Sequence, residues 1–238
     1  MTESNAEVPF LRWKQDEPPK PKGRLLFVTA ASGMGKTTTC MSLHHRHGFT
    51  YYEGDCFLGG SEPYPEGQAP AGPTRGGTRP LPRELLPAGF EDAVGTLMKS
   101  IFAYIRGGPV PTPADCAPFL TLLADDVRRE WDRIGGDFVV AFAIYDRPAR
   151  DLVRKLLADL NPTVVVLHGS EQLNAKRLLQ RHERLGEAIP EQLQTVQHRC
   201  RGFEAAGEDE PNTVGIELAE ELDADAVADL ILERLKTK

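Results

Sequence analysis

The sequence predicts an α/β domain in which a mostly parallel, five-stranded sheet carries helices on both faces. Short apolar runs alternate along the chain with longer segments of helical periodicity. A glycine-rich stretch also joins the first apolar run to the first helical segment. Because a strand, a crossover helix and a second strand form a right-handed unit, this alternation indicates one parallel sheet covered on both sides.

The predicted strands are short and apolar, and the predicted helices show an apolar stripe. The strands are expected at 25–28, 49–52, 137–144, 163–167 and 213–218. The helices are expected at 36–43, 91–104, 117–134, 147–160, 170–184 and 224–236. Ligands of parallel sheets bind at the carboxyl ends of the strands, so we expect the functional residues at that edge.

The chain divides into a tail and one domain. Residues 1–23 contain no apolar core and are rich in Lys and Pro, which predicts a flexible tail. Residues 24–238 form the predicted domain. Within it, segment 59–89 is dense in Gly and Pro, a spacing that the interior of a helix or strand does not tolerate. We therefore expect a long insertion there.

The composition favours a cytoplasmic protein that acts on small molecules. The chain has 28 basic and 35 acidic residues and a net charge of −7, which argues against nucleic acid as a main partner. No apolar run approaches the roughly 20 residues that cross a bilayer, so no membrane partner is expected. The four cysteines form no C-x-x-C pair, which argues against a disulfide framework or a zinc site.

The strongest motif is a phosphate-binding loop. Residues 30–37 read Ala-Ala-Ser-Gly-Met-Gly-Lys-Thr and fit the Walker A pattern with Ala in place of the first Gly. Backbone N–H groups of such a loop, and the positive end of the following helix, wrap the phosphates of a nucleotide. The motif leaves kinases, GTPases and ATPases open. The predicted nucleotide-binding residues are Ser32, Gly33, Met34, Gly35, Lys36, Thr37 and Thr38.

Two of these residues have specific predicted roles. We expect Lys36 to bridge the β- and γ-phosphates and so to stabilise the charge of the transferring group. We expect the Thr37 hydroxyl to bind Mg²⁺.

An acidic pair follows the second predicted strand, where the sequence reads Glu53-Gly54-Asp55. A carboxylate there could accept the proton of a substrate hydroxyl or reach Mg²⁺ through water. The alternative is an acidic turn or a helix cap. Because a phosphate loop precedes the pair, we predict Asp55 to be a site residue that orients or deprotonates the acceptor.

A basic cluster lies on the helix expected at 170–184. Arg177, Arg181 and Arg184 are spaced i, i+4, i+7, so they share one face. Guanidinium groups there could clamp a migrating phosphoryl group as its charge spreads. The alternative is a solvated face. We predict a catalytic role for Arg181, contact with the nucleotide for Arg177 and contact with the acceptor for Arg184.

Taken together, these stretches resemble the gluconokinase branch of the small P-loop kinases, relatives of shikimate kinase. The loop at 31–37 is similar to that family's Ser-Gly-x-Gly-Lys loop, and 53–55 is similar to its Asp-Gly-Asp. Residues 150–154 read Arg-Asp-Leu-Val-Arg and resemble the Arg-Asp-Leu-Leu-Arg after its third strand. Residues 166–169, followed by the arginines at 177 and 181, resemble its fourth strand and lid helix.

The resemblance implies a P-loop kinase fold with a lid at about 177–190, and ATP and Mg²⁺ as cofactors. It implies transfer of the γ-phosphoryl of MgATP to a hydroxyl of a small molecule, with a sugar acid such as gluconate as the first candidate. It also implies substrate contact for Arg150. Dimers are common among such relatives, so a homodimer is a further expectation.

The acceptor side departs from the family pattern. Cys56 and Phe57 stand where the family has His-Pro, and segment 59–89 follows directly. The Lys and Tyr that precede the family's Arg-Asp-Leu run are also replaced, with 147–149 reading Arg-Pro-Ala. Two alternatives stay open: a kinase for a nucleoside, nucleotide or other small alcohol, and a catalytically silent nucleotide-binding regulatory or scaffold protein.

Overall fold

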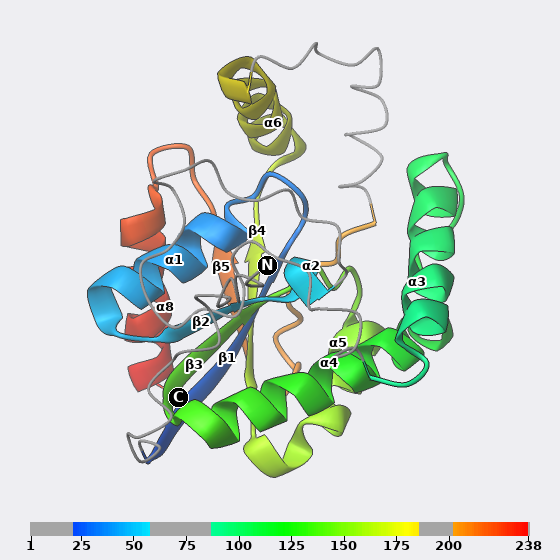
Figure 1. Cartoon of the computed structure of the whole chain (residues 1–238). Coiled ribbons are helices and arrows are strands. Elements are labelled where there is room, and N and C mark those ends of the chain that lie inside the picture. The colour runs from blue at the N-terminus through cyan, green and yellow to red at the C-terminus, as the bar shows by residue number, and fades with distance from the viewer. Residues whose placement is uncertain (1–20, 58–86, 186–201, 238) are drawn as a thin grey trace, which may run out of the picture.

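The computed structural model describes residues 21–57, 87–185 and 202–237. Five strands form one sheet in the order β2-β3-β1-β4-β5 (Figure 1). Every neighbouring pair is parallel, so all five carboxyl ends meet at one edge. The strands are β1 (Lys22–Ala30), β2 (Thr50–Glu53), β3 (Gly136–Ala141), β4 (Thr163–His168) and β5 (Thr213–Glu217). The predicted fold class is therefore confirmed.

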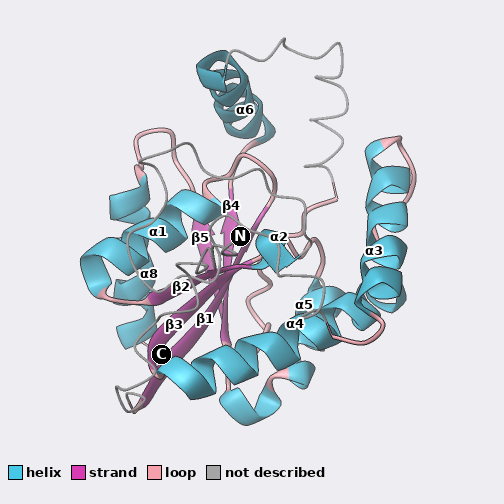
Figure 2. Ribbon diagram, in the orientation of Figure 1, coloured by secondary structure: helices cyan, strands magenta, loops and turns pink. Residues whose placement is uncertain are grey.

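Helices cover both faces of the sheet (Figure 2). The longer ones are α1 (Lys36–His47), α3 (Phe90–Ile105), α4 (Pro113–Ile134), α5 (Arg147–Leu156), α6 (Glu171–Leu185) and α8 (Ala224–Lys236). Two short elements are α2 (Gly54–Phe57) and the 3₁₀ turn η3 (Ala158–Leu160). In the described ranges, no helix combines the length and apolar character that crossing a bilayer requires.

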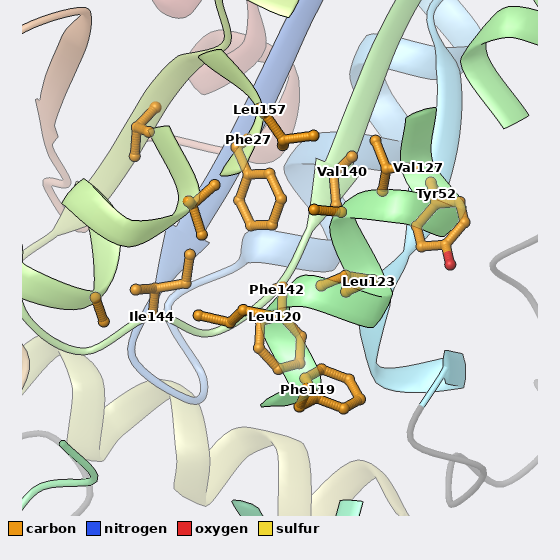
Figure 3. Packing of buried hydrophobic residues seen from close by; sticks show 14 of the residues in the cluster. Phe27, Tyr52, Phe119, Leu120, Leu123, Val127, Val140, Phe142, Ile144 and Leu157 are labelled. Atoms are coloured by element: carbon orange, nitrogen blue, oxygen red, sulfur yellow. The ribbon is translucent and has the colours of Figure 1, made fainter. Parts of the chain in front are cut away.

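The sheet separates two buried clusters, because successive strand residues point to opposite faces. Leu25 and Phe27 of β1 pack on the face covered by α3, α4 and α5, whereas Leu26 and Val28 pack on the face covered by α1 and α8. Figure 3 shows the first cluster, which contains Phe27, Tyr52, Phe119, Phe142 and Leu157 among others. Burial on both faces explains why the strands read as continuous apolar runs.

Two strand ends differ from the prediction by three residues. β1 begins at Lys22, inside the predicted tail, because Gly136 N donates to Pro21 O at 2.9 Å and Arg24 N donates to Asp137 Oδ1 at 2.7 Å. β3 ends at Ala141, three residues before the predicted end at 144. There Ile144 N donates to the Thr29 hydroxyl at 2.7 Å, a side-chain partner that replaces the strand ladder.

Parts of three predicted segments lie outside the described residues. They are residues 1–20 of the tail, residues 59–86 of the insertion and residues 186–190 of the lid. The end of the insertion, 87–89, is described and leads into α3, whose first residue is Phe90.

Candidate active site

The phosphate loop connects β1 to α1 at the carboxyl edge of the sheet. Gly33 and Gly35 both have φ of +84°, in the left-handed region that favours glycine. Gly35 is the N-cap of α1 and supplies no side-chain cap, and the first turn of α1 carries no acidic side chain. The first N–H groups of a helix have no partner within the helix, and the macrodipole there favours an anion. This end of α1 fits nucleotide phosphates.

Other loop residues stabilise the turn itself. Met34 is buried, and its N–H donates to Ala31 O at 3.2 Å. The Thr38 hydroxyl donates to Gly35 O at 2.9 Å. These groups shape the loop itself. The cationic and hydroxyl groups of the site come from Lys36 and Thr37.

Lys36 lies between two carboxylates. Its Nζ is 3.4 Å from Glu53 Oε1 and 3.7 Å from Asp55 Oδ2. Burial lowers the pKa of Lys36, but the negative charges of Glu53 and Asp55 raise it more, so the pKa stands above its ordinary value. Lys36 is therefore a full cation at neutral pH, as phosphate binding requires.

Glu53 is the centre of the site, although the sequence motif drew attention to Asp55 instead. Its side chain is only 5% exposed, whereas that of Asp55 is 47% exposed. One oxygen, Oε2, accepts from the Thr37 hydroxyl at 3.0 Å and from the Tyr51 hydroxyl. The other, Oε1, accepts from Asp55 N at 3.4 Å and faces Lys36. The sequence did contain a signal for Glu53: it is the last residue of β2, and ligands of parallel sheets bind at the carboxyl ends of the strands.

These oxygens also fit Mg²⁺. The Thr37 hydroxyl donates its proton to Glu53, which leaves the lone pairs of its oxygen for a metal. The described ranges contain no cluster of three or more His, Cys, Asp or Glu side chains that could hold a metal by themselves. Mg²⁺ suits such a site, because it keeps several waters and takes only one or two protein oxygens besides those of phosphates.

Helix α6 rests on the phosphate loop. Asn174 is buried and donates from Nδ2 to Ser32 O at 2.7 Å. A Cβ at Gly33 would lie 2.6 Å from Leu178 Cγ, so the loop and α6 are in direct contact. Arg177 donates to Leu222 O at 3.2 Å, in the turn between β5 and α8.

The other two arginines of the predicted clamp are less defined. The backbone of α6 includes Arg181 and Arg184, but their side chains lie outside the described part of the structure. Their catalytic and acceptor-binding roles stay predictions.

Arg150 is buried and paired with an acid. Its side chain is 0% exposed, and its Nε donates to Glu210 Oε1 at 2.7 Å. Other donors reach Glu210 Oε2 at 2.9 Å and Glu204 O at 2.9 Å. The guanidinium thus ties α5 to the segment before β5 and is buried in this structure. Substrate contact for Arg150 stays a prediction.

A small apolar hollow lies between α3, α4 and the segment that follows β3. It is lined by Leu97 and Ile101 of α3, Cys116 and Leu120 of α4, and the 142–145 segment that follows β3. Phe142 also contacts the site: a Cβ at Gly54 would lie 2.9 Å from Phe142 Cδ2. The glycine between Glu53 and Asp55 therefore lets the backbone at this point pack closely on Phe142, one of the residues that line the hollow.

The structure brings most of the predicted site together. Gly33, Gly35, Lys36, Thr37 and Asp55 converge at one edge of the sheet. Glu53 joins them, and Arg177 borders the loop, since a Cβ at Gly35 would lie 3.7 Å from Arg177 Nη1. Arg150 does not belong to this group.

Comparisons with known proteins agree with the fold. No family model matches the chain, and no curated protein matches it. Among solved structures, a gluconokinase from Sinorhizobium meliloti 1021 is 22% identical with a TM-score of 0.52, over 92% of this chain and 98% of its own. A sugar kinase from Janibacter sp. HTCC2649 is 21% identical with a TM-score of 0.54, over 91% of this chain and 95% of its own.

A third similar structure is the tunicamycin resistance protein of Deinococcus radiodurans, which is 15% identical with a TM-score of 0.50. It covers 90% of this chain and 96% of its own. At identities this low, the structural similarity supports a shared fold and nothing finer. The parallel sheet, the glycine-rich loop that leads into α1 and these similarities together show that the chain has the P-loop kinase fold.

Proposed function

We propose that the protein is an ATP-dependent phosphotransferase that moves the γ-phosphoryl of MgATP to a hydroxyl of a small molecule. The observation that carries the proposal is the convergence of Lys36 and Thr37 with Glu53 and Asp55 at the uncapped end of α1. Phosphoryl transfer needs a cation, a hydroxyl that can bind the metal and a carboxylate that can accept a proton.

Each residue has a defined part in the proposed reaction. The loop amides and Lys36 hold the phosphates and stabilise the charge that spreads over the transferring group. Thr37, with Glu53 as its partner, would hold Mg²⁺, which supplies further neutralisation of phosphate charge when bound. The half-exposed Asp55 accepts the proton of the acceptor hydroxyl. At the same time the oxygen of the acceptor forms the new bond to phosphorus, and ADP leaves.

Two classes of acceptor are proposed. The resemblance of the site motifs favours a sugar acid such as gluconate. The replaced acceptor-side residues at 56–57 and 147–149 leave a less polar alcohol as the second class. The arginines of α5 support the second class, because each is paired with an acid: Arg147 with Asp209 at 2.9 Å, and Arg150 and Arg154 with Glu210 at 2.7 and 3.0 Å.

A coupled assay of ADP release tests the proposal. The full chain would be given MgATP with sugar acids, shikimate-like acids, nucleosides, nucleotides and aromatic or alicyclic alcohols. Acceptor-dependent release above background hydrolysis, with a phosphorylated product seen by mass spectrometry, supports the kinase. Bound ATP with no product from any acceptor contradicts it and favours the silent nucleotide-binding alternative.

A further inference from the structure

Two consecutive tyrosines of β2 make the same kind of hydrogen bond on opposite faces of the sheet. Tyr51 is fully buried, and its hydroxyl donates to Glu53 Oε2. Tyr52 is 3% exposed, and its hydroxyl donates to Asp126 Oδ2 at 2.7 Å. Side chains alternate along a strand, so Tyr51 shares the α1 face with Glu53, whereas Tyr52 points into the cluster under α4 (Figure 3).

The position of Glu53 needs an explanation, because its side chain has three rotatable bonds and stands at the end of an edge strand. Tyr51, two residues before it, has a rigid ring that is fully buried in the cluster that also contains Cys40, Leu43 and Val139. A hydrogen bond from a fixed ring to a flexible carboxylate restricts where that carboxylate lies. The same oxygen, Oε2, also accepts the proton of Thr37.

The Thr37 hydroxyl is the third group in this series of hydrogen bonds, after Tyr51 and Glu53. A hydroxyl has one proton and two lone pairs, so donating the proton in a fixed direction also fixes the direction of the lone pairs. Glu53 sets that direction, and Tyr51 holds Glu53. Groups that orient metal ligands from behind have a measurable effect on metal affinity.

We propose that Tyr51 is a positioning residue for Mg²⁺: its hydroxyl holds the Glu53 carboxylate in the place from which it orients the metal-binding oxygen of Thr37. This inference rests on the proposed function, since it assumes that the loop binds MgATP. It adds a residue of β2 that touches neither nucleotide nor metal.

The test compares Tyr51→Phe with Tyr52→Phe in the full chain. The readout is binding of a fluorescent, non-hydrolysable ATP analogue at increasing Mg²⁺, together with its binding in EDTA. We expect Tyr51→Phe to raise the half-saturating Mg²⁺ concentration about tenfold, the lower end of the effect of losing a contact behind a metal ligand, because Tyr51 acts on Thr37 through Glu53. Binding of the analogue in EDTA should not change.

Tyr52→Phe is the matched control. It removes the same hydroxyl from the neighbouring buried ring and breaks a bond to a carboxylate of the same charge, but away from the loop. We expect it to leave the half-saturating Mg²⁺ concentration unchanged. Equal Mg²⁺ dependence in the two variants would overturn the proposal and leave Tyr51 a purely structural residue.

Two replacements of similar size keep the test decisive if Tyr51→Phe does not fold. 4-Fluorophenylalanine at position 51 fills the space of the hydroxyl without a donor, and 4-aminophenylalanine restores an N–H donor. The amino form should return the Mg²⁺ dependence toward wild type, and the fluoro form should not. If both forms behave alike, the proposal fails.

The outcome also separates this inference from the proposed function. A wild-type chain that binds the analogue with Mg²⁺ but phosphorylates no acceptor still tests Tyr51. A wild-type chain that binds no nucleotide overturns both.

Discussion

Lys36 Nζ lies 3.4 Å from Glu53 Oε1, so the cation of the phosphate loop is held against the end of the edge strand β2. Its ordered position means that little conformational entropy remains to be lost when phosphate binds. The nearby carboxylates keep it charged, as the raised pKa of Lys36 indicates.

Removing this cation should abolish most of the activity. We expect Lys36→Ala to lower turnover at least about a hundredfold, the scale of losing one preorganised donor to a transition state. The measurement is ADP release with a productive acceptor. Lys155→Ala, which changes an exposed lysine of α5, serves as control and should retain activity. Near-normal turnover in Lys36→Ala would exclude the mechanism.

Asp55 should matter for transfer more than for binding. We expect Asp55→Asn to lower kcat about a hundredfold or more, because an amide cannot accept the proton of the acceptor hydroxyl. The ATP analogue should still bind, since the loop amides and Lys36 are intact. If Asp55→Asn weakened analogue binding as much as it lowered turnover, the role of Asp55 would instead be to help bind the nucleotide.

A methyl group at Gly33 should disturb nucleotide binding. Alanine there would both strain the backbone at φ +84° and place its Cβ 2.6 Å from Leu178 Cγ. Gly48 offers a matched control, since its φ is +74° and a Cβ would meet nothing within 4 Å. We expect both variants to lose about 1–2 kcal/mol of stability from strain, but only Gly33→Ala to lose analogue affinity. A comparable loss of affinity in Gly48→Ala would argue against this view of the loop.

The arginines of α5 should differ in their effect on stability. Removing Arg150 leaves Glu210 buried with Arg154 as its remaining charged partner, so we expect Arg150→Met to lower the free energy of unfolding by about 3 kcal/mol, the lower end of the cost of breaking a buried pair. Arg147 pairs with Asp209, which is 76% exposed, and Arg147→Met should cost less than about 1 kcal/mol. Urea unfolding checks both. A stable Arg150→Met variant with lost turnover would support the substrate role that the sequence suggested.

The pair of Arg150 and Glu210 predicts that the stability of the fold depends on pH. Burial raises the pKa of Glu210, but hydrogen bonds and charge from Arg150 and Arg154 outweigh it and lower the pKa from 4.5 to about 2. A depressed carboxyl pKa contributes stability that is fully present above about pH 4.5 and is lost as pH falls toward about 2. The difference in free energy of unfolding between wild type and Glu210→Gln should therefore shrink from pH 5 to pH 3. A constant difference over that range would contradict the prediction.

Local pattern was enough to predict the sheet, because strands buried on both faces read as unbroken apolar runs. Residues 163–167 were predicted as a strand, and β4 covers Thr163–His168. Pattern failed at the end of β3, where Phe142 and Ile144 are as apolar as the strand but the Thr29 side chain takes over the backbone hydrogen bonds. Hydrophobicity alone does not distinguish a buried strand from a buried loop.

In the site, the phosphate loop could be predicted because its function depends on backbone shape and adjacent residues. Arg150 could not, because its partner Glu210 is sixty residues away in the sequence and only the fold brings the two together. The importance of Glu53 was missed for a related reason. Its partners Lys36 and Thr37 come from another element, and the motif alone did not show which of the two acids is buried.

The contacts of Asn174, Arg177 and Leu178 fix the first part of α6 to the phosphate loop and to the turn before α8. At about 1.5 Å of rise per residue, the seven residues of α6 that follow Leu178 extend about 10 Å beyond these contacts. A rotation of about 10° around Leu178 would carry the far end of α6 about 2 Å, given that length. A small displacement at the phosphate loop would thus become a larger displacement at the C-terminal end of α6, at Leu185.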